Sequence, residues 1–165
     1  LFSSLNIYSQ TALKIIQKLG YKIIIVTNQA GIAKGIFSKN DYEALTAWLM
    51  ADLLAEGISV LDCFHCPHHP NGILPAYSFQ CGCRKPAPGM ILQAKHQYDI
   101  DMSNSFLVGD KDSDIEAARR ANLGGYYLVE SGHPLNRSAF KYNIIKRDLY
   151  DVAIHLANLS DQKII

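Results

Sequence analysis

The chain has 165 residues, of which 48% are hydrophobic, enough for one domain with a sizeable apolar core. Its 16 Lys and Arg residues nearly balance its 15 Asp and Glu residues, so the formal charge is only +1. This balance argues against nucleic acid or an anionic membrane as the main partner. The sequence has neither an apolar run of about 20 residues nor a leader-like start. We therefore expect a single, monomeric, cytoplasmic domain over residues 1–165.

Helix and strand patterns alternate along the chain. Apolar residues at helical spacing predict helices over about 8–19, 39–56, 86–98, 113–122 and 149–158. Short apolar or β-branched runs predict strands at 22–26, 61–65, 105–108, 126–129 and 142–145, and a loop follows the first of them through Gly35. Such alternation predicts α/β structure with a doubly wound parallel sheet in a Rossmann-type three-layer sandwich.

All four cysteines lie in one short segment, and three histidines lie there with them. This crowding is typical of a metal-binding loop rather than of a disulfide scaffold. Reduced cysteines beside surface histidines are the alternative. We predict a structural Zn²⁺ site in a loop insert at about 63–84, with Cys63 and His65 as the candidate substitutes for two of its ligands. The tightest ligand set is Cys66, His68, Cys81 and Cys83.

Polar side chains follow two of the predicted strands, at the sheet edge where α/β folds bind ligands. Thr27 ends one strand, Asp110 follows another, and Lys85 precedes a helix that starts near the same edge. A hydroxyl, an ammonium and a carboxylate that converge in one pocket suit phosphoryl transfer, with Mg²⁺ on the carboxylate. Each residue alone also has a structural interpretation, as a turn residue, a solvated cation or a helix cap. Asp114 is either a second acidic ligand or a favourable first-turn charge.

Four segments of the chain carry a family resemblance, namely Thr27–Gly35, Cys66–Pro70, Cys81–Pro86 and Val108–Lys111. Together they resemble the phosphatases of the haloacid dehalogenase (HAD) superfamily. More narrowly, they resemble the branch of D-glycero-beta-D-manno-heptose 1,7-bisphosphate 7-phosphatases, whose near relative is histidinol-phosphate phosphatase; the anomer preference stays open. The resemblance extends over nearly the whole chain, and the Cys-x-His and Cys-x-Cys pairs are specific to this branch.

The resemblance implies a role for each matching residue. Thr27 and Lys85 stabilise the transferred phosphoryl group and are the implied catalytic residues. Asp110 binds catalytic Mg²⁺. The implied zinc ligands agree with the set chosen from spacing. The implied substrate-binding residues are Asn28, Gln29, Arg84 and Lys111.

One family motif has no match in this sequence. Members of the superfamily carry Asp-x-Asp-Gly-Thr after a first buried strand; the first Asp attacks phosphorus, and the second serves as general acid and base. Asp99-Ile100-Asp101 has the spacing but not the context, because Met102-Ser103 follows it and no strand precedes it. We expect the sequence to be part of a longer protein whose first, central strand precedes it, so that the neighbouring strands lack a ladder partner. A natural remnant that has lost this chemistry is the alternative.

The implied function is a Mg²⁺-dependent phosphatase that removes the 7-phosphate of heptose 1,7-bisphosphate for the lipopolysaccharide core. By family the chain is an enzyme, but as given we expect it to be inactive. The alternatives are a histidinol-phosphate phosphatase and an inactive phosphosugar-binding domain. The long spacer between His68 and Cys81 favours the heptose enzymes.

Overall fold

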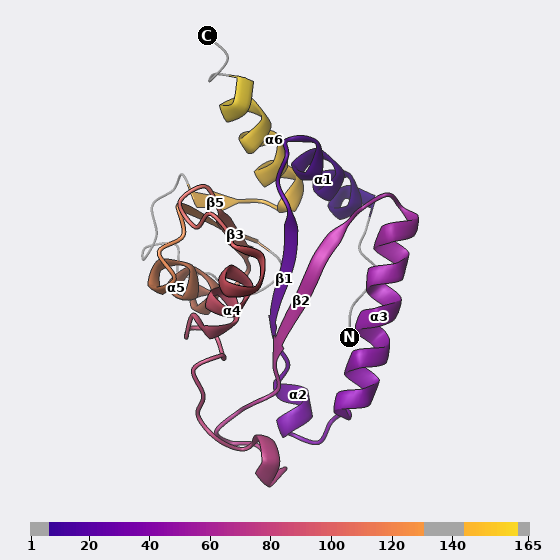
Figure 1. The fold of residues 1–165 in the computed structure, drawn as a ribbon, viewed down its shortest axis with the longest axis vertical. Coiled ribbons are helices and arrows are strands. Elements are labelled where there is room, and N and C mark those ends of the chain that lie inside the picture. Colours follow the sequence, from indigo (N-terminus) through magenta and orange to yellow (C-terminus); the bar gives the residue numbers. More distant parts are fainter. Residues whose placement is uncertain (1–6, 131–143, 162–165) are drawn as a thin grey trace.

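The computed structural model describes residues 7–130 and 144–161. Helices and strands alternate, and the strand pairs of this described part are parallel (Figure 1), which confirms the predicted α/β class. The helices are α1 (Ile7–Lys18), α2 (Ala30–Ala33), α3 (Lys39–Ala55), α4 (Gly89–Tyr98), α5 (Asp112–Arg120) and α6 (Leu149–Asp161), with a 3₁₀ turn η1 (Pro75–Tyr77). The strands are β1 (Ile23–Asn28), β2 (Val60–Cys66), β3 (Phe106–Gly109), β4 (Gly125–Val129) and β5 (Ile145–Lys146).

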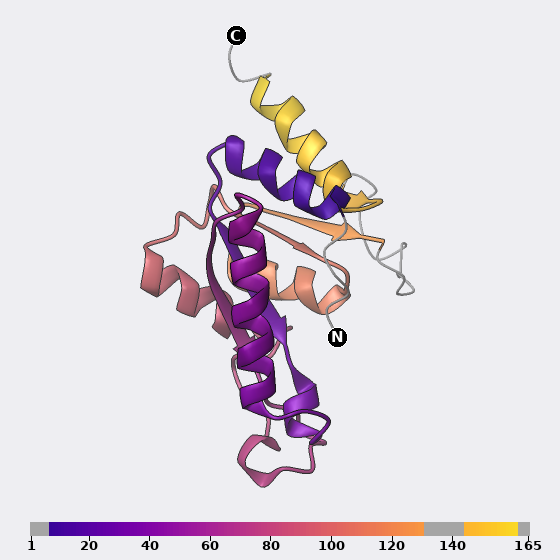
Figure 2. The ribbon, with the colours of Figure 1, turned by 90° about the vertical axis from the view of Figure 1, so that its right-hand side faces the viewer.

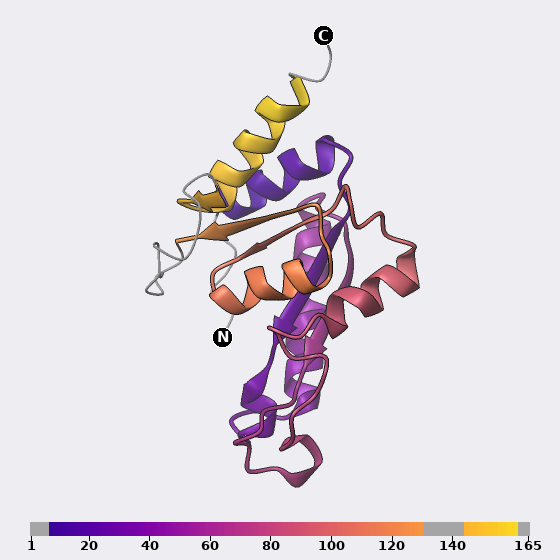
Figure 3. The same ribbon diagram turned by 90° about the vertical axis from the view of Figure 1, so that its left-hand side faces the viewer.

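The sheet is divided into two parts. One part pairs β1 with β2, and the other has the strand order β3-β4-β5. β1 and β3 face each other as the inner edges of the two parts, and the ring of Tyr21, just before β1, lies 4.9 Å from that of Phe106, which begins β3. Figure 3 shows β3 and β4 crossing β1 obliquely rather than lying alongside it. The sheet is thus interrupted between β1 and β3, in keeping with the expectation that neighbouring strands lack a ladder partner.

Helices cover both faces of β1 because its side chains alternate between two apolar cores. Ile23 and Ile25 pack against Leu49 and Leu53 of α3. Figure 2 shows α3 lying across this face of β1. Ile24 and Val26 point the other way, toward a core that contains Met90 of α4. Helix α1 contributes Leu13 to the same core as α3, so α1 and α3 lie on the same face of β1.

Four details differ from the sequence-based expectation. The loop expected after β1 contains the short helix α2, whose four residues are too few to give a periodic pattern. Helix α4 begins at Gly89 rather than at Pro86, because the segment up to Pro88 forms a turn that precedes the helix. The last helix continues to Asp161. The strand expected at 142–145 falls partly outside the described residues, and the strand seen there is β5.

The residues after β2 form a loop without strands that projects beyond the sheet beside α2 (Figure 1) and returns to α4. Its one regular element is η1. This loop contains the predicted metal-ligand set. Within 7–130 and 144–161, the structure has no helix that is both long and apolar enough to cross a membrane.

Candidate active site

Lys85 connects the carboxyl ends of β1 and β3. Its ammonium donates a hydrogen bond to the carbonyl oxygen of Val26, 2.8 Å away near the end of β1. The same ammonium lies 2.7 Å from the carboxylate of Asp114, on the helix that follows β3. The side chains of both charged residues are largely buried, 12% and 5% exposed. The structure therefore brings Lys85 to the sheet edge at which the sequence analysis expected it.

The end of β1 also holds the backbone at Lys85. The side-chain amide of Asn28 donates to the carbonyl oxygen of Lys85 and accepts from its backbone N–H, both at 3.0 Å. Gln29 donates from its side chain to the Thr27 hydroxyl at 3.1 Å, so the hydrogen of that hydroxyl stays available to a ligand. The amide of Asn28 thus holds the backbone of Lys85.

Asp114 is the one charged residue that is buried in the described ranges, with 4% of its surface exposed. Besides the ion pair with Lys85, its carboxylate accepts the backbone N–H of Lys111 at 3.0 Å. Gly109 permits this approach, since a Cβ there would lie 2.3 Å from the Cβ of Asp114. Asp114 lies in the first turn of α5, as one of its two interpretations has it, and its carboxylate is a buried partner for Lys85. The sequence pattern that pointed to a role for Asp114 was its position four residues after Asp110.

Asp110 and Lys111 lie between β3 and α5, at the N-terminal end of α5. The first backbone N–H groups of a helix have no partner within the helix. Asp110 directly follows β3, at the carboxyl end that β3 shares with the Lys85 contacts. An aspartate in this place offers oxygen ligands to a divalent cation.

Arg84 lies on the other side of Lys85, toward the metal-binding loop. Its guanidinium donates to the carbonyl oxygen of His68 at 3.3 Å. It lines a cleft of about 360 Å³ together with Lys85, His69 and Arg120. Loss of hydration and the charges of Arg84 and Lys34 lower the pKa of His69. The cleft is electropositive. His69 lies within the Cys66–Pro70 segment but was assigned no role from the sequence, and Arg120 stands in none of the four segments.

The predicted zinc ligands come together in the structure. Ligand atoms of Cys66, His68, Cys81 and Cys83 lie within 4.8 Å of one another, and five of the pairs are 3.1–3.6 Å apart. Ligand atoms about 2.3 Å from a tetrahedral zinc ion lie about 3.7 Å from each other, so the donor set and spacing fit zinc.

Burial raises the pKa of the fully buried Cys66 thiol. A bound cation acts against this rise, because it favours the thiolate. Cys63 lies outside the cluster, with its sulfur 3.5 Å from the hydroxyl of Tyr42.

Comparison with known proteins identifies the class first. Residues 82–152 match the family model described as HAD-hydrolase-like. The fold is similar to the solved structure of D,D-heptose 1,7-bisphosphate phosphatase from B. bronchiseptica, which is complexed with magnesium and phosphate. The match covers 93% of this chain and 83% of that one, with a TM-score of 0.79 and 29% sequence identity. The fold is that of a HAD-like hydrolase.

Curated relatives narrow the class to a family. The chain is 50% identical over 141 residues to D-glycero-alpha-D-manno-heptose-1,7-bisphosphate 7-phosphatase of Photorhabdus laumondii, over 86% of this chain and 76% of that protein. It is 41% identical to the beta-anomer enzyme of the same organism, over 83% of this chain and 73% of that protein. The chain belongs to the D-glycero-D-manno-heptose-1,7-bisphosphate 7-phosphatase family of HAD-like phosphatases. The resemblance found in the sequence is thus confirmed.

Proposed function

We propose that the site binds D-glycero-D-manno-heptose 1,7-bisphosphate and serves hydrolysis of its 7-phosphate. The observation that carries the proposal is the placement of Lys85, whose ammonium is fixed at the carboxyl ends of β1 and β3 by Val26 and Asp114. The names of the matched relatives support the substrate, since both Photorhabdus enzymes are 7-phosphatases of this heptose bisphosphate.

The residues of this chain divide the work by chemistry. The Thr27 hydroxyl donates to a phosphoryl oxygen, because its own lone pair already accepts from Gln29. Lys85 neutralises charge that develops on the phosphoryl group, in a partly buried setting where electrostatic effects are larger than in water. Arg84, in the electropositive cleft beside it, suits the second phosphate or a sugar hydroxyl. We assign Asn28 to positioning Lys85, and Gln29 and Lys111 to the substrate pocket.

Magnesium fits this edge through Asp110. The carboxylate of Asp114 is engaged by Lys85 and by the N–H of Lys111, whereas Asp110 directly follows β3 at its carboxyl end. One or two carboxylates with phosphate oxygens and waters are a common magnesium environment. When bound, the ion would neutralise charge on the phosphoryl oxygens.

We assign the Cys66, His68, Cys81 and Cys83 cluster to structural zinc. Four protein ligands fill a tetrahedral site and leave no position for a reacting water. The cluster joins the strand β2, which ends at Cys66, to the segment that carries Arg84 and Lys85. Zinc would therefore fix the loop that positions the catalytic lysine.

The sequence as given has no Asp-x-Asp-Gly-Thr segment, and the residues described above supply no nucleophile of that kind. They account for binding, orientation and charge neutralisation. An inactive phosphosugar-binding domain is the second candidate function for this reason.

The test is phosphate release by the natural protein, expressed from its own gene, on the alpha and beta anomers and on histidinol phosphate. We expect the alpha anomer to react fastest, in keeping with 50% identity to the alpha enzyme against 41% to the beta enzyme. Faster release from histidinol phosphate would contradict the substrate assignment. Tight phosphate binding without turnover would favour the binding domain.

We further propose that residues 1–165 belong to one HAD-like domain of a monomeric cytoplasmic protein, with its metal loop at about 63–84. Sedimentation of the zinc-loaded chain tests the monomer, for which a single species near 18.3 kDa is expected.

A further inference from the structure

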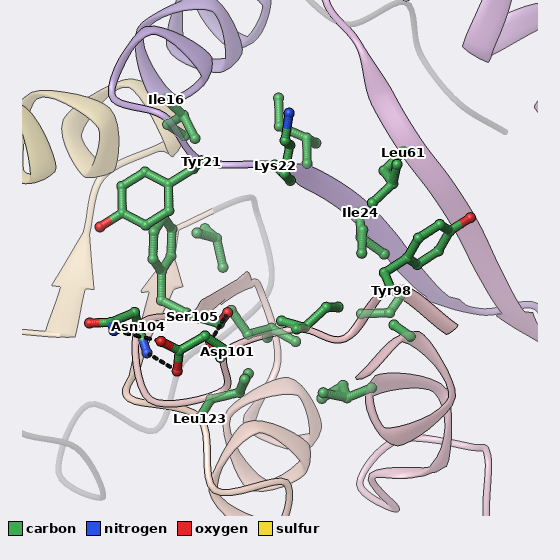
Figure 4. A pocket seen from close by; sticks show the side chains of 18 of the residues that line it. Ile16, Tyr21, Lys22, Ile24, Leu61, Tyr98, Asp101, Asn104, Ser105 and Leu123 are labelled. Atoms are coloured by element: carbon green, nitrogen blue, oxygen red, sulfur yellow. Dashed lines mark hydrogen bonds between the residues drawn. The ribbon is translucent and has the colours of Figure 1, made fainter. Parts of the chain in front are cut away.

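The cavity between the two parts of the sheet does not suit a phosphate group. It has a volume of about 710 Å³ and is lined mainly by aliphatic and aromatic side chains, such as those of Ile24, Leu61 and Tyr21 (Figure 4). Asp101 also lines it, and a carboxylate repels a phosphate. The hydrogen bond that this carboxylate accepts from the side chain of Asn104, at 2.7 Å, does not remove its charge. The second phosphate of a bisphosphate needs a site of the opposite charge.

The electropositive cleft beside the site has that charge. Its volume of about 360 Å³ is within the usual range for small-molecule sites. Arg84, Lys85 and Arg120 line it, and none of the described residues that line it is an aspartate or a glutamate. The ammonium of Lys85 is already paired with the carboxylate of Asp114. The two arginines therefore carry the charge that the cleft offers to an anion.

Arg84 enters the cleft from the segment before α4. Its guanidinium donates to the carbonyl oxygen of His68 at 3.3 Å, which uses one of its N–H groups and leaves others as donors. Among the ion pairs of residues 7–130 and 144–161, none includes Arg84. The charge of Arg84 therefore has no counter-ion in this part of the chain.

Arg120 enters the cleft from the last turn of α5, and Glu116 orients it. The Nε of Arg120 donates to the carboxylate of Glu116 at 2.8 Å, one helical turn earlier. Long side chains on a helix lean toward its N-terminus, and the N-terminus of α5 is the end beside Asp110. The bond to Nε leaves the two terminal nitrogens of the guanidinium as donors. With its side chain 50% exposed, Arg120 presents these donors to a ligand in the cleft.

We propose that Arg120 is a specificity-determining residue that binds the second phosphate of the substrate, the one that is not hydrolysed. Arg120 and Arg84 approach this phosphate from two elements, α5 and the segment before α4. A guanidinium pairs with a phosphate through two parallel hydrogen bonds, which give direction as well as affinity. Glu116 is the positioning residue, since it fixes the guanidinium that makes these bonds. The inference rests on the proposed function, because it assigns the second phosphate of that substrate.

This contact acts on binding rather than on the chemical step. The second phosphate keeps its charge while the first is hydrolysed, so Arg120 stabilises the bound substrate and the transition state equally. The loss of such a contact raises KM and leaves kcat unchanged. Lys85, by contrast, is assigned to the phosphoryl group on which charge develops, and its loss would lower kcat.

The experiment measures KM and kcat of the natural protein, expressed from its own gene, on heptose 1,7-bisphosphate and on heptose 7-phosphate. Arg120→Ala should raise KM for the bisphosphate by about tenfold or more, as expected for the loss of hydrogen bonds to a charged group. The kcat for the bisphosphate should stay within about twofold, and so should KM for the monophosphate, which has no second phosphate. An equal rise of KM for both substrates, or a loss confined to kcat, would overturn the proposal.

Arg119→Ala is the matched control, because it removes the same charge from the adjacent position. Arg119 is 64% exposed, lies 3.9 Å from the carboxylate of Glu116, and is not among the described residues that line the cleft. KM for the bisphosphate should therefore be unchanged in this variant. A rise equal to that of Arg120→Ala would mean that net charge alone attracts the substrate, and would overturn the proposal. Thermal melting establishes that both variants are folded.

A binding measurement separates this proposal from the proposed function. If the natural protein releases phosphate from neither heptose substrate, that function fails, but the cleft is still tested by calorimetric titration with heptose 1-phosphate in the presence of inorganic phosphate. Arg120→Ala should weaken the binding of heptose 1-phosphate by about tenfold, and Arg119→Ala should not. Equal affinities of the two variants, or no binding by the unmodified protein, would overturn the assignment of Arg120.

Discussion

The ammonium of Lys85 and the carboxylate of Asp114 form a buried ion pair, 2.7 Å apart, that joins the two parts of the divided sheet. Lys85 is hydrogen-bonded to β1, and Asp114 belongs to the helix that follows β3. The pair serves both the position of the site lysine and the contact between the halves of the molecule.

We expect Asp114→Ala to lower the free energy of unfolding by about 3 kcal/mol or more, because it leaves the ammonium of Lys85 buried without a counter-ion. Asp112→Ala is the matched control, since Asp112 is exposed in the first turn of the same helix. It should cost about 1 kcal/mol or less. Urea titration measures both, and equal losses would contradict a special role for Asp114.

Thr27→Val should lower phosphate release by the natural protein by about 10²–10³-fold, the effect of removing one donor to a developing negative charge. Valine keeps the shape of threonine but has no hydroxyl. The same substitution at Thr46, which lies on α3, controls for the loss of a hydroxyl as such. A comparable loss of turnover at both positions would exclude a direct role for Thr27.

Cys83→Ser should lower the thermal midpoint of the zinc-loaded chain, whereas Cys63→Ser should leave it nearly unchanged. The reason is that Cys83 belongs to the four-residue cluster and Cys63 does not. Metal binding stabilises the folded state because the unfolded chain lacks the assembled site. A chelator should abolish the difference between Cys83→Ser and the unmodified chain. A midpoint that does not respond to zinc would contradict the structural assignment.

Acid should weaken the loop before β3 through Asp101. Hydrogen bonds from Ser103 and Asn104 lower the pKa of this carboxyl to about 2, below its ordinary value of 3.8. A depressed folded-state pKa contributes stability above the unfolded pKa, and this contribution is lost as the pH falls through the folded value. Asp101→Asn should therefore be less stable than the natural sequence at pH 5, with the gap closing between pH values of about 4 and 2. A gap independent of pH, measured by urea unfolding, would contradict this cause.

Local patterns were enough to predict most elements and the metal cluster. The β-branched run before Thr27 and the close Cys-x-His and Cys-x-Cys pairs express short-range rules of strand formation and metal geometry. Lys85 was placed at the right edge for a similar reason, since it precedes a helix in a fold whose strand ends converge.

The features that could not be predicted from the sequence depend on long-range packing. Whether Asp114 binds metal or pairs with a lysine depends on the approach of Lys85, which is 29 positions earlier in the chain. Arg120 joins the electropositive cleft only because its helix packs near the metal-binding loop. Such contacts between residues far apart in the chain cannot be predicted from the spacing of residues in the sequence.

Cys66 belongs to two structures at once. It is the last residue of β2, where its carbonyl oxygen accepts the backbone N–H of Gln29 at 2.8 Å, and its sulfur lies in the metal cluster. A change in metal occupancy therefore reaches the end of β1 through one residue, without passing along the loop.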